Sequence, residues 1–322
     1  MEFEKNLQIG NLKTVEKKLD KIFNKHKFDE NIFLDSLIAD RITWHCGGMS
    51  DPFQPIESKL KVTKNLINIT NEYNIDILFS TKSDTVYNAN IRPDLHSFQL
   101  SVTNLNDRKD IEPNVPDISN RIEFYKYLKK QGFKVGIRVQ PFIPNVTNAD
   151  IVDVFSDADY FTIEGLKLVP QNKEHKEKMF QLFNLTPNDF TQMGLLNLKP
   201  EIRIKMYKDM IDKLQKYKIP FSIADNDMHD TSSGKCCCGD PLIKKSTNFN
   251  NTSMVYKYGT NYKLEDVLLE CGNYSKCKAK HLFTSNRQEG CTTVSDFYKK
   301  RFDRSTSPMS PKFLYVNKQS KQ

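Results

Sequence analysis

The sequence has few cysteines in its first two thirds, no long apolar run and none of the common nucleotide-binding signatures. Only Cys46 precedes residue 235, whereas the other six of the seven cysteines follow it. Such an uneven distribution argues against a disulfide framework. No stretch approaches the roughly 18 apolar residues of a membrane span, and the first residues lack a signal-peptide core. We therefore expect a cytoplasmic protein without membrane association. The lack of a glycine-rich fingerprint or a P-loop disfavours the nucleotide-binding folds that carry them.

Basic residues exceed acidic ones. The chain has 48 Lys and Arg against 40 Asp and Glu, which gives a formal net charge of +8. An excess of this sign favours polyanionic partners such as nucleic acid. The lysines are spread along helix-like segments such as 13–27, and this pattern is also typical of a solvated helix face. The charge therefore keeps nucleic acid open as a partner without assigning a surface to it.

Strand-like and helix-like segments alternate through the first 230 residues. Strand-like runs lie near 42–45, 76–80, 98–102, 133–139, 160–164 and 221–224, and helix-like stretches near 12–26, 55–73, 119–131, 147–156 and 200–217. This alternation predicts an α/β fold, a partial (β/α)6 TIM-type barrel of parallel strands with right-handed crossovers. We expect the barrel over 1–230, a Cys-rich C-terminal extension over 231–303 and a flexible basic tail over 304–322.

Small and polar residues gather where the predicted strands end. The first strand runs into Cys46 and the pair Gly47-Gly48, and Ser50 and Asp51 follow just before a helix. Later strand ends carry Lys82, Ser101, Thr103, Arg138 and Gln140. Because parallel α/β folds bind ligands at the carboxyl edge of the sheet, these residues make up the candidate site.

Four motifs follow one another along these strand ends. They are S-D-P-F-Q-P-I-E at 50–57, T-K-S at 81–83, E-P at 112–113 followed by a helix with Arg121, and R-V-Q-P-F-I-P at 138–144. In this order they resemble the radical S-adenosylmethionine superfamily, in particular the branch of spore photoproduct lyase and the "DNA repair photolyase" proteins. The resemblance covers residues 40–165 well and the flanks more weakly.

The resemblance implies a barrel that binds S-adenosylmethionine beside a [4Fe–4S] cluster and forms a 5′-deoxyadenosyl radical, which abstracts hydrogen from a substrate. It implies lyase-like chemistry, an electron donor such as flavodoxin or ferredoxin, and nucleic acid as one candidate substrate. By position it places Gly47 and Gly48 beside the methionine part, Ser50 and Asp51 at its polar groups, Lys82 opposite its carboxylate, Ser101 and Thr103 at the ribose, and Arg138 and Gln140 around the pocket.

One part of the family pattern is missing. In this family three cysteines spaced C-x3-C-x2-C after the first strand hold the cluster, and that spacing does not occur in the chain. Residues 12–23 match the helix that follows this loop in the family. We therefore expect a split or truncated form that needs an N-terminal fragment to supply the cluster, and the activity of the chain alone is in question.

The cysteines leave further assignments open. Cys46 lies two residues before Gly48, which occupies the position of the hydrogen-donating cysteine of spore photoproduct lyase; it is a candidate catalytic residue, with a buried structural cysteine as the alternative. Candidate ligands of an auxiliary iron–sulfur cluster or zinc ion are Cys236, Cys237, Cys238, Cys271, Cys277 and Cys291. A second function is thus open: a non-redox basic (β/α) module with a structural metal site that binds nucleic acid.

Overall fold

The computed structural model describes residues 10–28, 33–48, 50–169, 172–193, 195–225, 228, 231–234 and 239–245. Within these ranges six strands form one sheet in which all neighbours are parallel. In sheet order they are β1 (Trp44–Cys46), β2 (Ile77–Thr81), β3 (His96–Ser101), β4 (Lys134–Phe142), β5 (Tyr160–Gly165) and β9 (Phe221–Ile223). Sheet order follows chain order, as expected when crossovers share one hand. The predicted α/β fold with parallel strands is confirmed.

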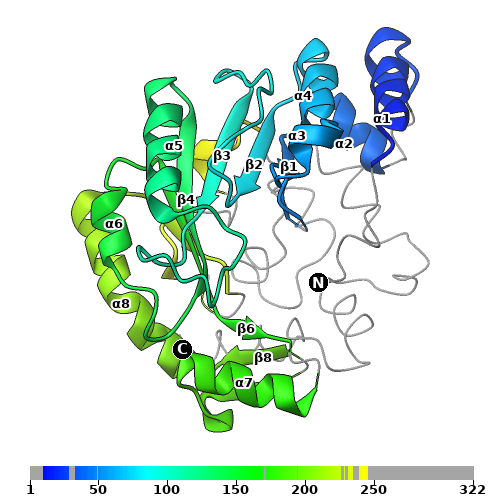
Figure 1. The fold of residues 1–322 in the computed structure, drawn as a ribbon. Helices are drawn as coiled ribbons and strands as arrows, with labels where there is room; N and C mark the ends of the chain where they lie inside the picture. The colour runs from blue at the N-terminus through cyan, green and yellow to red at the C-terminus, as the bar shows by residue number, and fades with distance from the viewer. Residues whose placement is uncertain are drawn as a thin grey trace, which may run out of the picture.

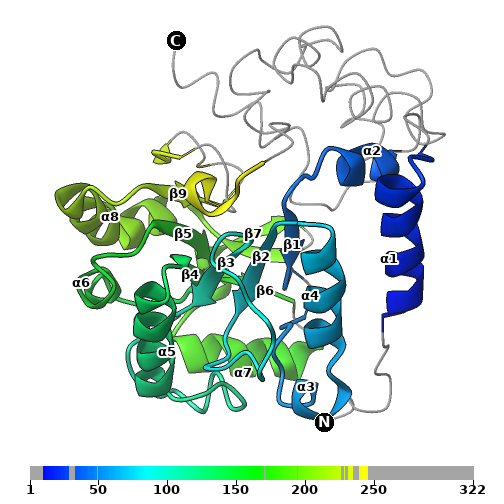
Figure 2. The same ribbon diagram turned by 90° about the horizontal axis from the view of Figure 1, so that it is seen from above.

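Helices cover one side of the curved sheet (Figure 1). Figure 2 shows α4, α5, α6 and α8 outside the curve of the strands, whose other face is concave. The helices beside the sheet are α1 (Leu12–Leu19) with its continuation η2 (Asp20–Asn24), α2 (Phe33–Ala39), α3 (Glu57–Leu60), α4 (Val62–Glu72), α5 (Ile118–Lys130), α6 (Asp150–Val154) and α8 (Pro200–Tyr217). In the part of the chain that the structure describes, no helix is both long and apolar enough to cross a bilayer.

The strand register sorts side chains into two faces, because successive residues of a strand point to opposite sides. On the helix-covered face Phe79 is in register with Phe98, and both belong to the main apolar core. Burial of this core under the helices is the main stabilising contribution to the fold. On the concave face the neighbouring positions are polar, and Ser80 is in register with Gln99. The polar candidate residues therefore line the inside of the curve.

The predicted helix over 55–73 is interrupted at Lys61. Lys61 has a φ of 54° in the left-handed region, so α3 ends before it and α4 begins after it. The buried carboxylate of Glu57 accepts a hydrogen bond from the backbone N–H of Lys64 at 3.1 Å, which satisfies a donor in the first turn of α4. Local capping, rather than helix periodicity, sets this break.

Between β5 and α8 the chain forms a small unit that the sequence did not lead us to predict. Its elements are β6 (Lys167–Leu168), α7 (Lys173–Phe183), the 3-10 helix η3 (Pro187–Asp189), β7 (Phe190–Met193) and β8 (Leu195–Leu198). Its strands are antiparallel in the order β6-β8-β7, and it has its own apolar core, which includes Ile143 and Phe180. The unit follows the carboxyl end of β5 and lies beyond that edge of the main sheet (Figure 1).

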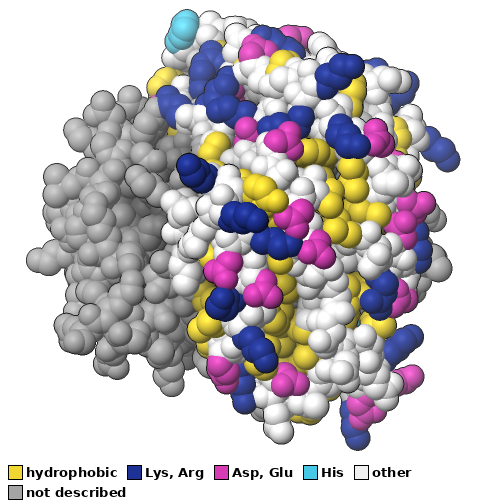
Figure 3. All heavy atoms as spheres, turned by 90° about the vertical axis from the view of Figure 1, so that its left-hand side faces the viewer, with side chains coloured by type: hydrophobic (Ala, Val, Ile, Leu, Met, Phe, Trp, Pro, Cys, Tyr) yellow, Lys and Arg dark blue, Asp and Glu magenta, His cyan; other side chains and the backbone are white. Residues whose placement is uncertain are grey.

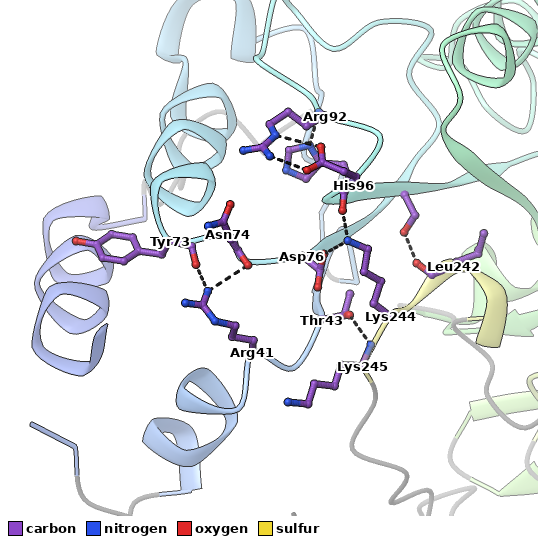
Figure 4. Close-up of polar contacts among 12 residues, drawn as sticks. Arg41, Thr43, Tyr73, Asn74, Asp76, Arg92, His96, Leu242, Lys244 and Lys245 are labelled. Carbon is purple, nitrogen blue, oxygen red and sulfur yellow. Dashed lines mark hydrogen bonds and ion pairs between the residues drawn. The ribbon is translucent and has the colours of Figure 1, made fainter. Parts of the chain in front are cut away.

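The 239–245 segment, which includes the 3-10 helix η5 (Asp240–Leu242), packs at the opposite end of the barrel (Figure 4). Leu242 contacts Leu78 and Tyr160 in a small apolar cluster, and its carbonyl accepts a hydrogen bond from Ser97 Oγ. Lys244 Nζ pairs with Asp76 Oδ1 at 2.9 Å, just before β2 begins. The segment thus packs against the amino end of the strands.

The segment also reaches the edge of the sheet. The backbone N–H of Thr43 donates to Lys245 O at 2.9 Å, and the N–H of Lys245 donates to Thr43 Oγ1 at 3.2 Å. Of the extension that we expected over 231–303, only 231–234 and 239–245 lie among the described residues. The expected tail over 304–322 lies outside them.

Replacement of Leu242 by Ala should lower the free energy of unfolding by about 2–5 kcal/mol, because it leaves a cavity at a side chain that is 3% exposed. Urea denaturation of the full chain measures this change. Ile204→Ala is the control, since Ile204 is 59% exposed on α8, and it should shift stability by no more than about 0.5 kcal/mol. Similar small effects of both substitutions would contradict the packing role of the 239–245 segment.

Candidate ligand site at the carboxyl edge of the sheet

The chain passes very close to β2 at Gly47. Gly47 has a φ of 116°, and a Cβ built on it would lie 2.1 Å from the carbonyl oxygen of Ser80. Only glycine accepts both the backbone conformation and the close approach. Gly48 and Ser50 follow as exposed residues of the loop. The predicted glycine turn is therefore a tight crossing over the end of the neighbouring strand.

Asp51 ties this loop to the end of β2. Its Oδ1 accepts hydrogen bonds from the backbone N–H of Phe53 at 2.9 Å and from Thr81 Oγ1 at 2.7 Å. Its Oδ2 accepts from the backbone N–H of Lys82 at 2.6 Å. Both carboxylate oxygens are thus engaged by the protein itself, and Asp51 fixes the position from which the Lys82 side chain starts.

Lys82 extends toward β3 and meets Glu112. Lys82 Nζ forms an ion pair with Glu112 Oε1, and Thr103 Oγ1 donates to Glu112 Oε2 at 2.7 Å. Burial raises the pKa of Glu112, but the charge and hydrogen bond of Lys82, the Thr103 hydroxyl and the charge of Arg121 outweigh it, so the pKa is lowered overall. Arg121 Nη1 donates to the carbonyl oxygen of Ser101 at 2.8 Å. The structure thus brings Lys82, Ser101 and Thr103 together, and their roles toward a ligand stay predictions.

A polar row crosses the concave face next to this cluster. His45 Nε2 lies 2.7 Å from Ser80 Oγ, which donates to Gln99 Oε1 at 3.0 Å. Arg138 Nη1 donates to the same Gln99 oxygen at 3.2 Å, and Arg138 Nε donates to Gln140 Oε1. Arg138 and Gln140 are therefore adjacent on the concave face, and Gln99 holds the guanidinium in place.

The far wall of the concave face is held by a buried carboxylate. Asp225 Oδ2 accepts from the backbone N–H of Gly165 at 3.1 Å and from the Tyr207 hydroxyl at 2.7 Å, while Oδ1 pairs with Arg203 Nη1 at 3.3 Å. Nearby Glu164 pairs with Lys167, yet burial dominates and raises the pKa of Glu164. The ends of β5 and β9 are thus locked to α8.

Cys46 lies on the other side of the sheet from this row. It is in register with Phe79 and packs against the main apolar core. Burial, with smaller contributions from the charges of Asp51 and Glu57, raises the pKa of the Cys46 thiol to about 11. This environment is typical of a structural cysteine. The catalytic role of Cys46 stays a prediction that its orientation does not favour.

The described residues do not fit an iron–sulfur cluster. Cys46 is the one free cysteine among them, and the described part of the chain contains no group of three His, Cys, Asp or Glu side chains placed to hold a metal ion. The candidate auxiliary ligands lie outside the described residues; they are Cys236, Cys237, Cys238, Cys271, Cys277 and Cys291.

Sequence reasoning missed Ser80, Gln99 and His45 as members of the site. A signal for the first two was present, since each polar residue directly follows a phenylalanine within a predicted strand, as in Phe98-Gln99-Leu100. Both are less than a tenth exposed. A buried polar side chain needs partners, so such positions indicate a polar interior.

The helix-covered side of the molecule has mixed charge. Figure 3 shows Lys and Arg side chains interspersed with Asp and Glu over this side. Lys213 of α8 pairs with Asp150 of α6 at 2.7 Å, and Lys208 pairs with Asp212 at 2.7 Å. Because opposite charges alternate here, this side presents no single-sign patch of described residues for a polyanion.

Comparison with family models gives no match. Among curated proteins, an uncharacterised protein of Methanocaldococcus jannaschii is 30% identical over 146 residues, which cover 42% of this chain and 56% of that protein. The match thus spans little more than half of that relative. Among solved structures, spore photoproduct lyase with a dinucleoside spore photoproduct has a TM-score of 0.46 and 15% identity, covering 60% of this chain and 65% of that one. SuiB of Streptococcus suis has a TM-score of 0.41 and 12% identity, covering 65% of this chain and 42% of that one.

Substitution of Asp51 by Asn should lower the free energy of unfolding by about 1–3 kcal/mol, because an amide cannot accept hydrogen bonds from all three donors. Ser50→Ala, one residue away and exposed, is the matched control and should leave stability unchanged. Urea denaturation measures both. Equal stability of Asp51→Asn and the wild type would contradict the role of Asp51 in joining the loop after β1 to the end of β2.

Alkylation should distinguish Cys46 from a reactive thiol. With a pKa of about 11, roughly one Cys46 side chain in a thousand is a thiolate at pH 8. Iodoacetamide should therefore modify the folded chain at Cys46 at least about 100-fold more slowly than the urea-unfolded chain, and the rate should rise with pH beyond pH 9. Mass spectrometry of the Cys46 peptide measures the rate. Fast labelling of the folded chain at pH 7 would contradict the buried assignment.

Proposed function

We propose that this chain is the S-adenosylmethionine-binding barrel of a radical S-adenosylmethionine enzyme similar to spore photoproduct lyase. The observation that carries the proposal is the Lys82 ammonium at the carboxyl edge of β2, beside Ser101 and Thr103 and next to the glycine turn at Gly47. A cation beside small hydroxyl residues suits a ligand with an amino-acid carboxylate and a ribose. The motif order noted in the sequence supports the same ligand.

In this proposal each part of the edge has a role in binding. The exposed Gly48 lets a ligand approach the backbone of the loop, and Lys82 faces the carboxylate. Ser101 lies near the ribose, while Arg138 and Gln140, aligned by Gln99, close the concave side. The barrel thus binds and orients the nucleoside, whereas bond cleavage belongs to the cofactor.

The cluster requires thiolates from outside the described residues. In this proposal they come from a separate N-terminal fragment with C-x3-C-x2-C, as in a split enzyme, and the late cysteines of this chain hold an auxiliary cluster or zinc ion. A cluster held by such thiolates would supply the electron for radical formation from S-adenosylmethionine, taken from a donor such as flavodoxin or ferredoxin. Nucleic acid is one candidate class for the substrate from which hydrogen is abstracted. The proposed location is the cytoplasm.

The second candidate is a non-redox module in which the late cysteines bind zinc and the basic chain binds nucleic acid. The net charge of +8 favours it. The mixed charge of the side in Figure 3 counts against that side as the binding surface.

Anaerobic reconstitution of the full chain with iron and sulfide tests the proposal. We expect a [4Fe–4S] spectrum, and 5′-deoxyadenosine on addition of S-adenosylmethionine and dithionite, either for the chain alone or with a fragment that carries C-x3-C-x2-C. Lys82→Met should reduce product formation by about tenfold or more at subsaturating S-adenosylmethionine. Liquid chromatography of the nucleoside products measures it.

Metal analysis separates the two candidates. One zinc per chain, salt-dependent binding of DNA and no 5′-deoxyadenosine under either condition would overturn the radical proposal and support the second candidate. Cys46→Ala serves as the control variant for the cluster, since a thiol packed in the core should not change the iron content.

A further inference from the structure

The hydroxyl of Thr103, for which the sequence suggested a ribose contact, already forms a hydrogen bond within the protein. Its hydroxyl donates to Glu112 Oε2 at 2.7 Å, and a hydroxyl group has one hydrogen to donate. The side chain of Thr103 is fully buried. Its bond therefore fixes the Glu112 carboxylate rather than leaving a donor for a ligand.

Glu112 in turn fixes the end of the Lys82 side chain. The carboxylate is 10% exposed, and Lys82 is 33% exposed, so the pair lies at the boundary between the protein and the open edge. The other end of Lys82 is held as well, because its backbone N–H donates to Asp51 Oδ2 at 2.6 Å. One ammonium hydrogen serves Glu112, which leaves two donors of the same group for a ligand.

A second cation lies near the pair. Arg121 is 4% exposed, donates to the carbonyl oxygen of Ser101, and its charge also acts on Glu112. Lys82 and Arg121 thus both act on the Glu112 carboxylate. Because two cations share Glu112, it can hold Lys82 in place while the ammonium keeps positive charge for an incoming carboxylate.

We propose that Glu112, held by Thr103, is a positioning residue that fixes the Lys82 ammonium to receive the carboxylate of an amino-acid-bearing nucleoside. This inference rests on the proposed function and adds residues that act through Lys82. A lysine side chain that is already ordered loses less conformational freedom on binding, so the ligand binds more tightly.

Calorimetric titration of the full chain with two nucleosides tests the inference. S-adenosylmethionine carries the carboxylate, whereas 5′-methylthioadenosine has the same adenine and ribose without it. Thr103→Val and Glu112→Gln should each weaken binding of S-adenosylmethionine by about tenfold, and leave the affinity for 5′-methylthioadenosine within about twofold. Glu112→Asp should weaken the binding of S-adenosylmethionine less than Glu112→Gln does, because it keeps the negative charge.

Lys129→Met is the matched control. Lys129 pairs with Asp159 at 2.9 Å, with 23% and 29% of the side chains exposed, at the amino end of the strands and far from the site. It removes a comparable ion pair and should leave the ratio of the two affinities unchanged. Circular dichroism and thermal melts of every variant confirm folding.

Each other outcome has a defined meaning. If Thr103→Val weakened the binding of both nucleosides equally, Thr103 would act as a ribose contact, and this result would overturn the inference. If Glu112→Gln bound S-adenosylmethionine more tightly than the wild type, Glu112 would compete with the ligand carboxylate for Lys82. This result would overturn the inference as well. A wild-type chain that binds neither nucleoside contradicts the proposed function, and the inference fails with it; a wild type that binds both, with unchanged variants, contradicts the inference alone.

Discussion

The carboxylate of Asp51 is the interaction on which the geometry of the edge depends. It accepts hydrogen bonds from Phe53, Thr81 and Lys82, and so joins the loop after β1 to the end of β2. β1 has only three residues, so its pairing with β2 offers little to fix the loop beyond it. The close approach at Gly47 adds a steric constraint to this polar one. Together they fix Gly47 and Asp51, on either side of this loop, against the sheet edge.

Much of the fold could be predicted from the sequence, because buried parallel strands are apolar runs whose ends meet at one edge. The grouping of Lys82 with Ser101 and Thr103 followed from this rule alone. The contacts inside the group did not, since alternation gives the side of a strand but not which polar atoms pair across it. Cys46 shows the limit of the alternation rule. Its two-residue spacing from Gly48 suggested a shared face, but β1 ends at Cys46 and the turn at Gly47 begins a new direction.

The concave face shows how a barrel tolerates a polar interior. Gln99 uses both ends of its amide, since Oε1 accepts from Ser80 and Arg138 while Nε2 donates to Thr162 Oγ1 at 3.0 Å. Buried polar atoms are costly unless they are paired, and a fully paired row is stiff. The stiffness aligns Arg138 before any ligand arrives. In the proposed function this edge therefore depends also on residues that do not touch the ligand, and sequence motifs do not mark such residues.

The unit between β5 and α8 has a core separate from that of the barrel. Among the described residues seven buried side chains form it, and Met206 of α8 is a partly buried residue that borders both cores. Separate cores favour separate cooperative units, and a small unit opens at a lower free energy than the whole domain. The wall beyond the carboxyl edge can therefore undergo local unfolding while the parallel sheet stays intact. In the proposed function, access to the edge would then depend on the stability of this unit, which substitutions in its core can change without altering the residues at the carboxyl edge.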